Sequence, residues 1–353
     1  MVPFASVDTP AVLVDLDVAE ANIDRFQRYC DAYGLKARPH IKTHKLPRLA
    51  RRQIEAGAVG ITCQKVSEAL AMVADGGIDD VLLTYNILGE AKLRELRHLH
   101  ELVRLTVVAD NPTVVDGLSG AFADAPAPLR VLVECDTGAG RCGVTTPEAA
   151  AELAATIDAA PGLVFEGLMT YPPKGDAAGA AAWLERAKAA CEARGLEVRR
   201  VSSGGSPDIW EAHCWPVITE YRPGTYVYFD RSLVERGVCT YDDCALTVLA
   251  TVVSVPTAHR AIIDAGSKVL TSDLLGLTGH GHVLGRPDIV IDQLSEEHGR
   301  LLSDQPIGLR VGERVRIVPN HACVVSNMLD RVVLVRGDRV EGPEPVAARG
   351  RVW

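Results

Sequence analysis

Eight short apolar runs of strand length recur in the first 221 residues, and helix-forming segments separate most of them. Connecting segments such as "PEAAAELAATIDAA" repeat Ala, Leu and Glu with helical spacing. Strands that alternate with helices form parallel sheets, and eight such units predict an α/β fold, a closed (β/α)8 barrel of the TIM type. The predicted strands are residues 35–37, 59–62, 81–84, 105–109, 131–134, 163–170, 198–202 and 217–221.

The sequence changes character after about residue 240. Runs such as "ALTVLATVVSV" and "RVVLVRGDRV" are short, rich in β-branched residues and separated by Gly, Pro and Asp. They predict a β-rich domain over residues 241–353, after a barrel over residues 16–240. A strand within residues 1–15, in "AVLVDLD", precedes the first predicted helix and can join either domain.

Composition and charge exclude several classes of protein. The formal net charge of -9 over 353 residues argues against non-specific nucleic-acid binding. No apolar run approaches the roughly 18 residues that span a bilayer, and "MVPFASVDTP" lacks the plan of a signal peptide. The nine cysteines form no disulfide framework, so we expect reduced thiols in a cytoplasmic protein.

The segment "RPHIKTHK", Arg38 to Lys45, gathers positive charge in this acidic chain. It follows the first predicted barrel strand, and catalytic side chains of such barrels lie at the carboxyl ends of strands. We therefore expect His40 and Lys42 at the barrel mouth, where neighbouring cations and desolvation lower the pKa of a lysine. A lysine of lowered pKa suits Schiff-base chemistry. A solvated basic loop is the alternative interpretation.

Three more loops follow predicted strands and contain small or cationic residues. "ECDTGAGRCGV" places an arginine in a Gly-rich turn, and "SSGGSPD" leaves backbone N–H groups free to bind a phosphate. "YRPGTYVYFD" follows the eighth strand, where barrels often bind phosphate. Together with Lys42, these loops suit pyridoxal 5'-phosphate. The residues expected to contact it are His40, Lys42, Arg141, Tyr171, Ser203, Gly204, Gly205, Ser206, Arg222, Gly224 and Thr225.

With these motifs the chain resembles the fold-type III pyridoxal phosphate enzymes, the alanine racemase-like group. Within that group it resembles the branch of D-threonine aldolase and D-serine dehydratase, from "DTPAVLVDLD" to "VPNHAC". The resemblance implies that Lys42 carries the cofactor, that Arg141 contacts its phenolic oxygen and that Arg222 faces its pyridine nitrogen. It also implies a homodimer.

The segment "PNHACVVSN" contains His321 and Cys323, which share a face if the segment is an extended strand. Imidazole and thiolate are a zinc-like ligand pair, although His-x-Cys also occurs by chance. The resemblance implies a divalent metal here, zinc or manganese, bound by a His and by an Asp or Cys.

The resemblance implies a lyase that acts on β-hydroxy-D-amino acids, with two possible outcomes. Retro-aldol cleavage gives glycine and an aldehyde, as in D-threonine aldolase. β-Elimination gives a 2-oxo acid and ammonia, as in dehydratases of D-serine or D-threo-3-hydroxyaspartate.

Features of the sequence point to both outcomes. Cys323 resembles the dehydratases, whereas "CQKVSEAL" and the chain length resemble the aldolases. Tyr171 in "LMTYPPKGD" matches the family, but the histidine that follows this tyrosine in aldolases is absent, so Lys174 or a water is the candidate base. We expect an aldolase; a dehydratase, a racemase and a non-catalytic carrier of the cofactor are the alternatives.

Overall fold

The chain forms two compact units in the computed structural model, which describes residues 7–337 and 339–353. The barrel unit comprises Phe26–Lys42, Pro47–Gly224 and Arg351–Trp353. The β unit comprises Met1–Arg25, Thr43–Leu46 and Thr225–Gly350. The chain therefore passes from one unit to the other several times.

The barrel unit contains eight parallel strands in the order β2-β9-β8-β7-β6-β5-β4-β3. A parallel bridge between His40 and Thr62 joins the two ends of this order, so the sheet closes. The predicted TIM-type barrel is confirmed, and every predicted strand overlaps an observed one. The strands are β2 (Lys36–Ala37), β3 (Ile61–Cys63), β4 (Asp80–Leu83), β5 (Arg104–Ala109), β6 (Leu129–Cys135), β7 (Leu163–Thr170), β8 (Arg200–Ser203) and β9 (Glu220–Tyr221).

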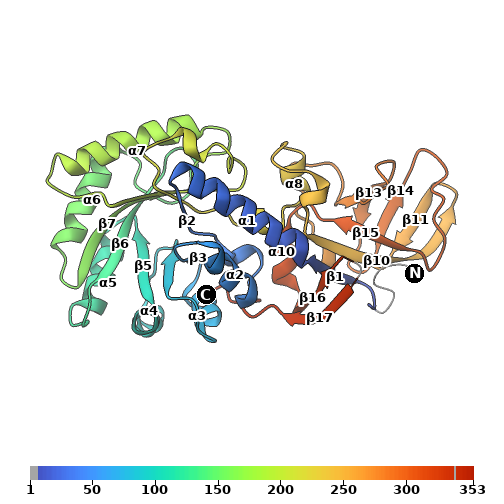
Figure 1. The fold of residues 1–353 in the computed structure, drawn as a ribbon, viewed down its shortest axis with the longest axis horizontal. Coiled ribbons are helices and arrows are strands. Elements are labelled where there is room, and N and C mark those ends of the chain that lie inside the picture. The colour runs from blue at the N-terminus through green and yellow to red at the C-terminus, as the bar shows by residue number, and fades with distance from the viewer. Residues whose placement is uncertain (1–6, 338) are drawn as a thin grey trace. The chain divides into compact units, whose positions relative to one another are not determined.

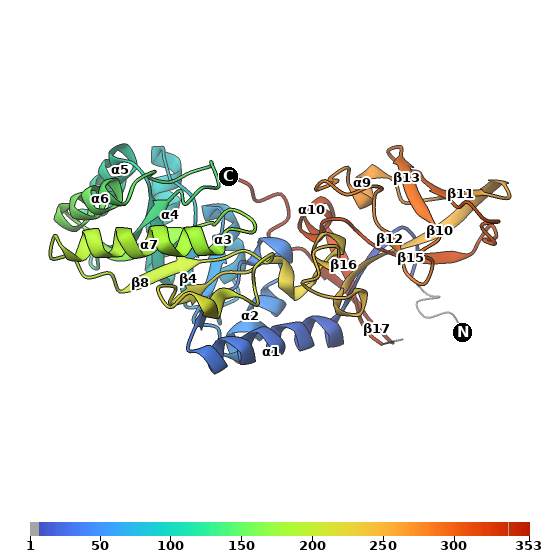
Figure 2. The same cartoon turned by 90° about the horizontal axis from the view of Figure 1, so that it is seen from above.

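Helices connect these strands and cover the barrel (Figures 1 and 2). Side-chain caps start several of them: the Asn111 side chain accepts from Val114 N, and that of Thr146 accepts from Ala149 N. Proline at the first turn of both helices fits the same start, because its missing N–H would have no partner there. The helices between barrel strands are α2 (Pro47–Ala56), α3 (Val66–Val73), α4 (Glu90–Leu102), α5 (Pro112–Phe122), α6 (Pro147–Ala159) and α7 (Ala177–Glu192). Helix α1 (Leu16–Tyr33) leads from β1 to β2 and begins in the β unit.

The β unit contains one sheet in which β1 lies between β10 and β16. It pairs antiparallel with β10 and parallel with β16, and Leu13 and Val14 in β1 are fully buried. The expected β-rich second domain is confirmed. Its strands are β1 (Ala11–Asp15), β10 (Leu246–Thr257), β11 (Arg260–Ile263), β12 (His282–Val283), β13 (Val290–Leu294), β14 (Gly299–Leu302), β15 (Arg314–Val318), β16 (Arg331–Arg336) and β17 (Arg339–Pro345); its short helices are α8 (Arg231–Val234), α9 (Ser267–Leu270) and α10 (Ala322–Met328).

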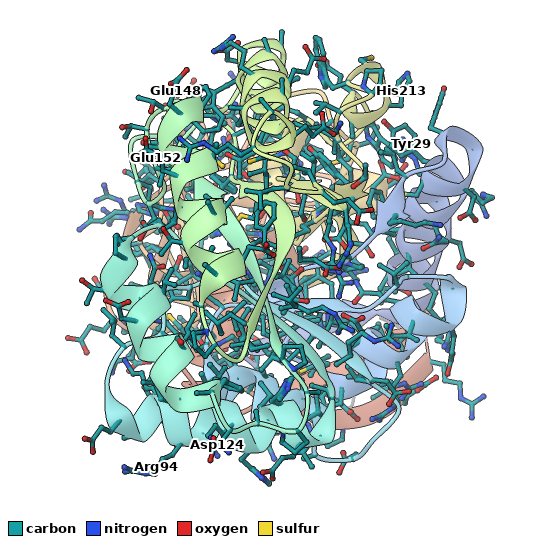
Figure 3. The ribbon with its side chains drawn as sticks, turned by 90° about the vertical axis from the view of Figure 1, so that its left-hand side faces the viewer. Tyr29, Arg94, Asp124, Glu148, Glu152 and His213 are labelled. Atoms are coloured by element: carbon teal, nitrogen blue, oxygen red, sulfur yellow. The ribbon has the colours of Figure 1, made fainter. Side chains whose placement is uncertain are left out.

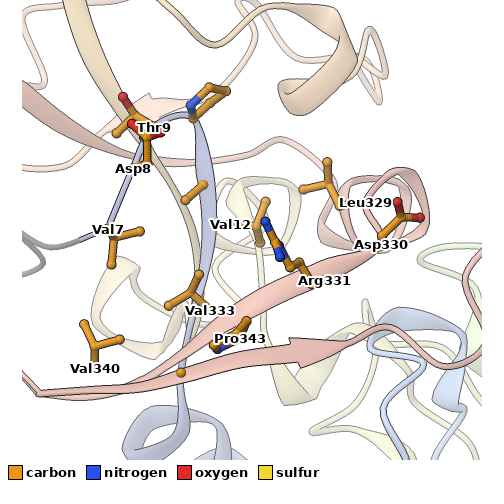
Figure 4. Close-up of a pocket in the computed structure, with 13 residues that line it drawn as sticks. Val7, Asp8, Thr9, Val12, Leu329, Asp330, Arg331, Val333, Val340 and Pro343 are labelled. Carbon is orange, nitrogen blue, oxygen red and sulfur yellow. The ribbon is translucent and has the colours of Figure 1, made fainter.

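A cavity of about 600 Å³ lies in the β unit beside β1, β16 and β17 (Figure 4). Its lining is mainly apolar, with Val12, Val333 and Val340, and it includes the charged residues Asp330 and Arg331. Within the described part of the chain, none of the residues predicted to bind a cofactor or metal lines it. The predicted site residues lie instead in the barrel loops and at α10.

A buried ion-pair network holds the barrel together where its shortest strands meet. Arg38 is 2% exposed and donates from Nε to Glu220 and from Nη1 to Asp80, both at 2.6 Å. Glu220 also accepts from the Ser202 hydroxyl at 2.7 Å. A Cβ at Gly60 would lie 2.4 Å from Arg38 Nη1, so only glycine leaves room for the guanidinium. These contacts link β2, β4, β8 and β9.

The Arg38 network generates a stability prediction. Arg38→Met leaves the buried Glu220 carboxylate without its main counter-charge, and breaking a buried pair in this way typically costs about 3–5 kcal/mol. We expect a large decrease in the urea midpoint of unfolding. The control is Arg94→Met on α4 (Figure 3), whose pair with Glu90 is exposed and contributes little. Equal midpoints for the two variants would contradict this role of Arg38.

Candidate active site

The residues predicted to bind the cofactor lie at the carboxyl ends of the barrel strands. Because all eight strands are parallel, these ends share one side of the barrel. His40 and Lys42 follow β2, Arg141 follows β6 and Tyr171 follows β7. Ser203 ends β8, Gly204, Gly205 and Ser206 follow it, and Arg222 and Gly224 follow β9. Thr225 belongs to the β unit, and Lys174 is exposed in the loop after β7.

The loop that carries Lys42 is fixed by His40. His40 N donates to Pro223 O at 2.9 Å, and its Nε2 lies 3.1 Å from Gln64 Oε1. Lys42 N donates to His40 Nδ1 at 3.3 Å, so Nδ1 is the acceptor and Nε2 carries the ring proton toward Gln64. Lys42 itself is half-buried in a 3-10 turn, Ile41–Thr43. The imidazole thus holds the backbone beside Lys42 in one arrangement.

The glycine-rich loop after β8 fits a phosphate group. A Cβ at Gly204 would lie 2.7 Å from Arg222 N, so glycine is required for this close approach of two backbones. The Ser206 hydroxyl is buried and has no hydrogen-bond partner among the described residues. A buried hydroxyl without a partner is costly unless a ligand completes it. The phosphate of pyridoxal phosphate would be such a ligand.

Two arginines lie at this end of the barrel in different surroundings. Arg222 is 5% exposed and donates from Nε to Ser202 Oγ at 2.8 Å and from Nη2 to Thr170 O. Burial lowers its pKa to about 10, against the opposing effect of Glu220 and Glu134. Arg141 is half-exposed, and its guanidinium lies 4.7 Å from the centre of the Tyr171 ring. Arg222 is therefore fixed, whereas Arg141 contacts solvent and the tyrosine face.

In the β unit, His321 and Cys323 start helix α10. The extended strand expected here is wrong, because Ala322 N donates to Asp230 Oδ2 at 3.0 Å and the helix begins at that residue. The pair still lies close enough to interact, since Cys323 raises the pKa of the His321 imidazole. Thr43 Oγ1 lies 3.1 Å from Cys323 Sγ, and Thr225 Oγ1 lies 3.6 Å from it.

Asp230 is the member of this cluster that sequence reasoning missed. Its carboxylate is fully buried, accepts from the Ser232 hydroxyl at 2.6 Å and lies 3.2 Å from His321 Nδ1. A carboxylate on one nitrogen of an imidazole leaves the other nitrogen free to bind a metal. The only sequence signal was that Asp230 ends the stretch "YRPGTYVYFD".

The electrostatics of the pair favour a bound cation. Burial alone would lower the pKa of His321, but Cys323 and Asp230 raise it to about 10. The two groups therefore hold a proton on the imidazole, which a metal would have to displace, and the nitrogen and sulfur donors of the pair suit zinc. No group of three or more His, Cys, Asp and Glu side chains arranged for a metal occurs in residues 7–337 and 339–353. The pair would hold a metal with positions open for other ligands.

His213 lies outside this site, in a cluster of aromatic side chains of the barrel unit. Its Nδ1 lies 2.8 Å from the Tyr29 hydroxyl, which accepts from His213 N at 3.0 Å, and Figure 3 shows these two residues together at one edge. The His213 ring stacks on Tyr33 with ring centres 3.9 Å apart. These contacts give His213 a packing role.

Comparison with known proteins finds a matching family model for most of each unit. Residues 14–232 match the family model "Alanine racemase, N-terminal domain", and residues 245–335 match "Putative serine dehydratase domain". A 3-hydroxy-D-aspartate aldolase of Paracoccus denitrificans is 34% identical, over 98% of this chain and 93% of its own. The crystal structure of a D-threonine aldolase from Filomicrobium marinum has 35% identity and a TM-score of 0.93, over 99% and 98% of the two chains.

A dehydratase is also similar. The structure of D-threo-3-hydroxyaspartate dehydratase from Delftia sp. HT23 has 29% identity and a TM-score of 0.87, over 96% of this chain and 98% of its own. A cysteine mutant of a dehydratase with that name is described in a metal-free form.

The position of Asp230 generates a metal-binding prediction. Asp230→Asn keeps the size of the side chain but removes the charge behind His321. We expect zinc affinity to fall about 10- to 100-fold, as is usual when such a carboxylate is lost. Competition with a chromophoric chelator measures this. Asp243→Asn, in the partly exposed cap of a 3-10 turn in the same unit, is the control and should leave affinity unchanged. Equal affinities for the two variants would rule out this role.

Proposed function

Because this chain belongs to the alanine racemase-like, fold-type III family of pyridoxal phosphate enzymes, we propose that it cleaves β-hydroxy-D-amino acids as an aldolase of the D-threonine aldolase type. The chain is a pyridoxal phosphate-dependent lyase of β-hydroxy-D-amino acids. The relatives at 34–35% identity are aldolases for D-threonine and 3-hydroxy-D-aspartate, which favours retro-aldol cleavage.

The observation that carries the proposal is that one chain has both the Lys42 loop and the His321–Cys323 pair backed by Asp230. Pyridoxal phosphate, when bound, supplies an electron sink for a substrate's α-carbon. Lys42 would bind it covalently and exchange protons at that carbon, while Ser206 and the backbone N–H groups of the loop would bind the phosphate. Arg141 and Arg222 would hold positive charge at the cofactor ring.

A divalent cation, zinc or manganese, would supply Lewis acidity toward the substrate's β-hydroxyl, lowering its pKa. His321 and Cys323 would hold it, with Asp230 orienting the imidazole. Tyr171, whose ring lies under Arg141, and Lys174 are the proposed groups that exchange protons with the substrate. Lys174 is exposed in a loop, so it has room to turn toward a ligand.

Dehydration is the second candidate function, and Cys323 favours it. The sequence relates a cysteine at this position to the dehydratases, and the similar dehydratase structures include a metal-free cysteine mutant. A non-catalytic carrier is disfavoured, because the relatives that match nearly the whole chain are enzymes.

Three expectations from the sequence stay predictions. They are the homodimer, the cytoplasmic location and the domain boundaries. No helix among the described residues is long and apolar enough to cross a bilayer.

The proposed function predicts the products and the metal requirement. Enzyme loaded with pyridoxal phosphate and zinc or manganese should convert D-threonine to glycine and acetaldehyde, measured by chromatography and by coupled reduction of the aldehyde. Chelation should abolish turnover and leave the cofactor absorbance in place, because the predicted metal ligands are distinct from the cofactor residues. Cys323→Ala should behave like chelated enzyme, and Cys323→Asp should favour manganese, since a carboxylate is the harder ligand.

The outcomes of this experiment separate the candidates. Formation of 2-oxobutanoate and ammonia would identify a dehydratase. Full turnover by enzyme without detectable metal would disprove the role of His321 and Cys323.

The proposed function also predicts which lysine binds the cofactor. Borohydride reduction of the loaded enzyme, followed by peptide mass spectrometry, should place the cofactor on Lys42 alone. Lys42→Ala should lose the label, whereas Lys188→Ala, on the surface of α7, should keep it. A label on any other lysine would refute the assignment.

A further inference from the structure

Glu134 is a buried carboxyl at the cofactor end of the barrel that the proposed function does not use. It is the next-to-last residue of β6 and is 3% exposed. Its Oε1 lies 3.9 Å from Arg141 Nη2, which is within ion-pair range but beyond hydrogen-bond distance. A buried carboxyl at a functional end of a barrel strand needs a physical reason.

The charged groups around Glu134 follow three strands of the barrel, β5, β6 and β9. Arg141 in the following loop and Arg222 after β9 attract its carboxylate, while Asp110 and Asp136 repel it. The Asp110 carboxylate accepts from Gly143 N at 2.9 Å, and Asp136 accepts from two glycine N–H groups of the same loop at 3.0 Å. These two aspartates therefore shape the turn. Glu134 is left as the carboxyl that interacts with both arginines.

Burial has the largest effect on the pKa of the Glu134 carboxyl. It raises the pKa to about 7, with Asp110 and Asp136 acting in the same direction and the two arginines against it. The nearby Cys142 thiol responds to the same carboxylate, since burial first and Glu134 next raise its pKa. Small changes in the surrounding charge therefore decide whether Glu134 is ionised.

The two arginines are those that the family resemblance assigns to opposite sides of the cofactor ring. Arg222 is buried, and Glu220 and Glu134 are the carboxylates that raise its pKa against burial. Glu220 already accepts from Arg38 and Ser202. Arg141 lies within ion-pair range of Glu134. One carboxylate thus offsets positive charge at both arginines.

We propose that Glu134 is the counter-charge shared by Arg141 and Arg222, and that it sets how firmly the linkage between Lys42 and the cofactor holds its proton. This inference rests on the proposed function. An ionised Glu134 offsets the positive potential of the two arginines and so favours the protonated linkage. A neutral side chain leaves two uncompensated cations near the linkage, which then releases its proton more readily. Glu134 is a positioning residue, because it acts through the arginines.

The test is a spectrophotometric pH titration of the cofactor-loaded enzyme, in which the absorbance reports the proton on the linkage. Glu134→Gln keeps the shape and removes the charge, so the proton should dissociate about tenfold more readily, as expected for loss of one nearby charge. Glu134→Asp keeps the charge and should titrate within about twofold of the natural enzyme. Glu166→Gln is the matched control: Glu166 lies in β7 and pairs with Arg200 at 3.2 Å, away from the cofactor loops. It should titrate unchanged.

Each outcome decides the proposal. A Glu134→Gln enzyme that titrates like the natural enzyme, or at higher pH, overturns it. If Glu134→Gln does not fold, Glu134→Asp decides alone: a tenfold change in spite of the retained charge overturns the proposal, and a near-natural titration supports it. The proposed function fails separately, if the natural enzyme shows no cofactor absorbance or if borohydride labels a lysine other than Lys42.

Discussion

Closure of the barrel beside Arg38 is the constraint on which the cofactor loop depends. Strands β2 and β9 have only two residues each, so few ladder hydrogen bonds hold this part of the sheet. The buried guanidinium of Arg38 adds hydrogen bonds to this part of the sheet, because it donates to both Asp80 and Glu220. Two residues later, His40 bridges to Thr62 and orients the backbone at Lys42. The position of Lys42, the proposed cofactor lysine, thus follows from a structural ion pair.

This arrangement explains why an acidic chain concentrates positive charge in "RPHIKTHK". The segment is not a basic surface, because its members have separate partners. Arg38 is paired inside the barrel, and Lys45 is buried in the β unit, where Nζ donates to Asn327 Oδ1 at 2.8 Å and to Ala348 O at 3.2 Å. The half-buried Lys42 lies between them in the chain and is the member assigned to chemistry. Similarly, carboxylates lie beside two other proposed site residues: Asp230 beside His321, and Glu134 beside Arg141.

The sequence predicted most of the barrel, because hydrophobic periodicity and glycine-rich turns are local signals. The eight strands and the loops that follow them could be assigned in this way. Local signals failed at Ala322, where a helix starts because Asp230, 92 residues earlier, accepts from its backbone N–H. The sequence also did not reveal the charged neighbours of Glu134, because Arg222 follows β9 and Asp110 follows β5, whereas Glu134 lies in β6. Charge networks of this kind depend on tertiary structure, and periodicity does not reveal them.

The place of β1 in its sheet has a consequence for the order in which the protein can fold on the ribosome. Among the strands of residues 7–337 and 339–353, β1 is synthesised first, yet Leu13 pairs with Thr247 of β10 and with Val333 of β16. During synthesis this apolar strand stays unpaired, because its partner strands β10 and β16 lie more than two hundred residues later in the sequence. The second of them, β16, is synthesised after the whole barrel. The barrel strands pair almost entirely with their neighbours in sequence and can assemble earlier. The nascent chain must therefore carry an unpaired, aggregation-prone strand through most of its synthesis, which is a burden that chaperones are suited to relieve.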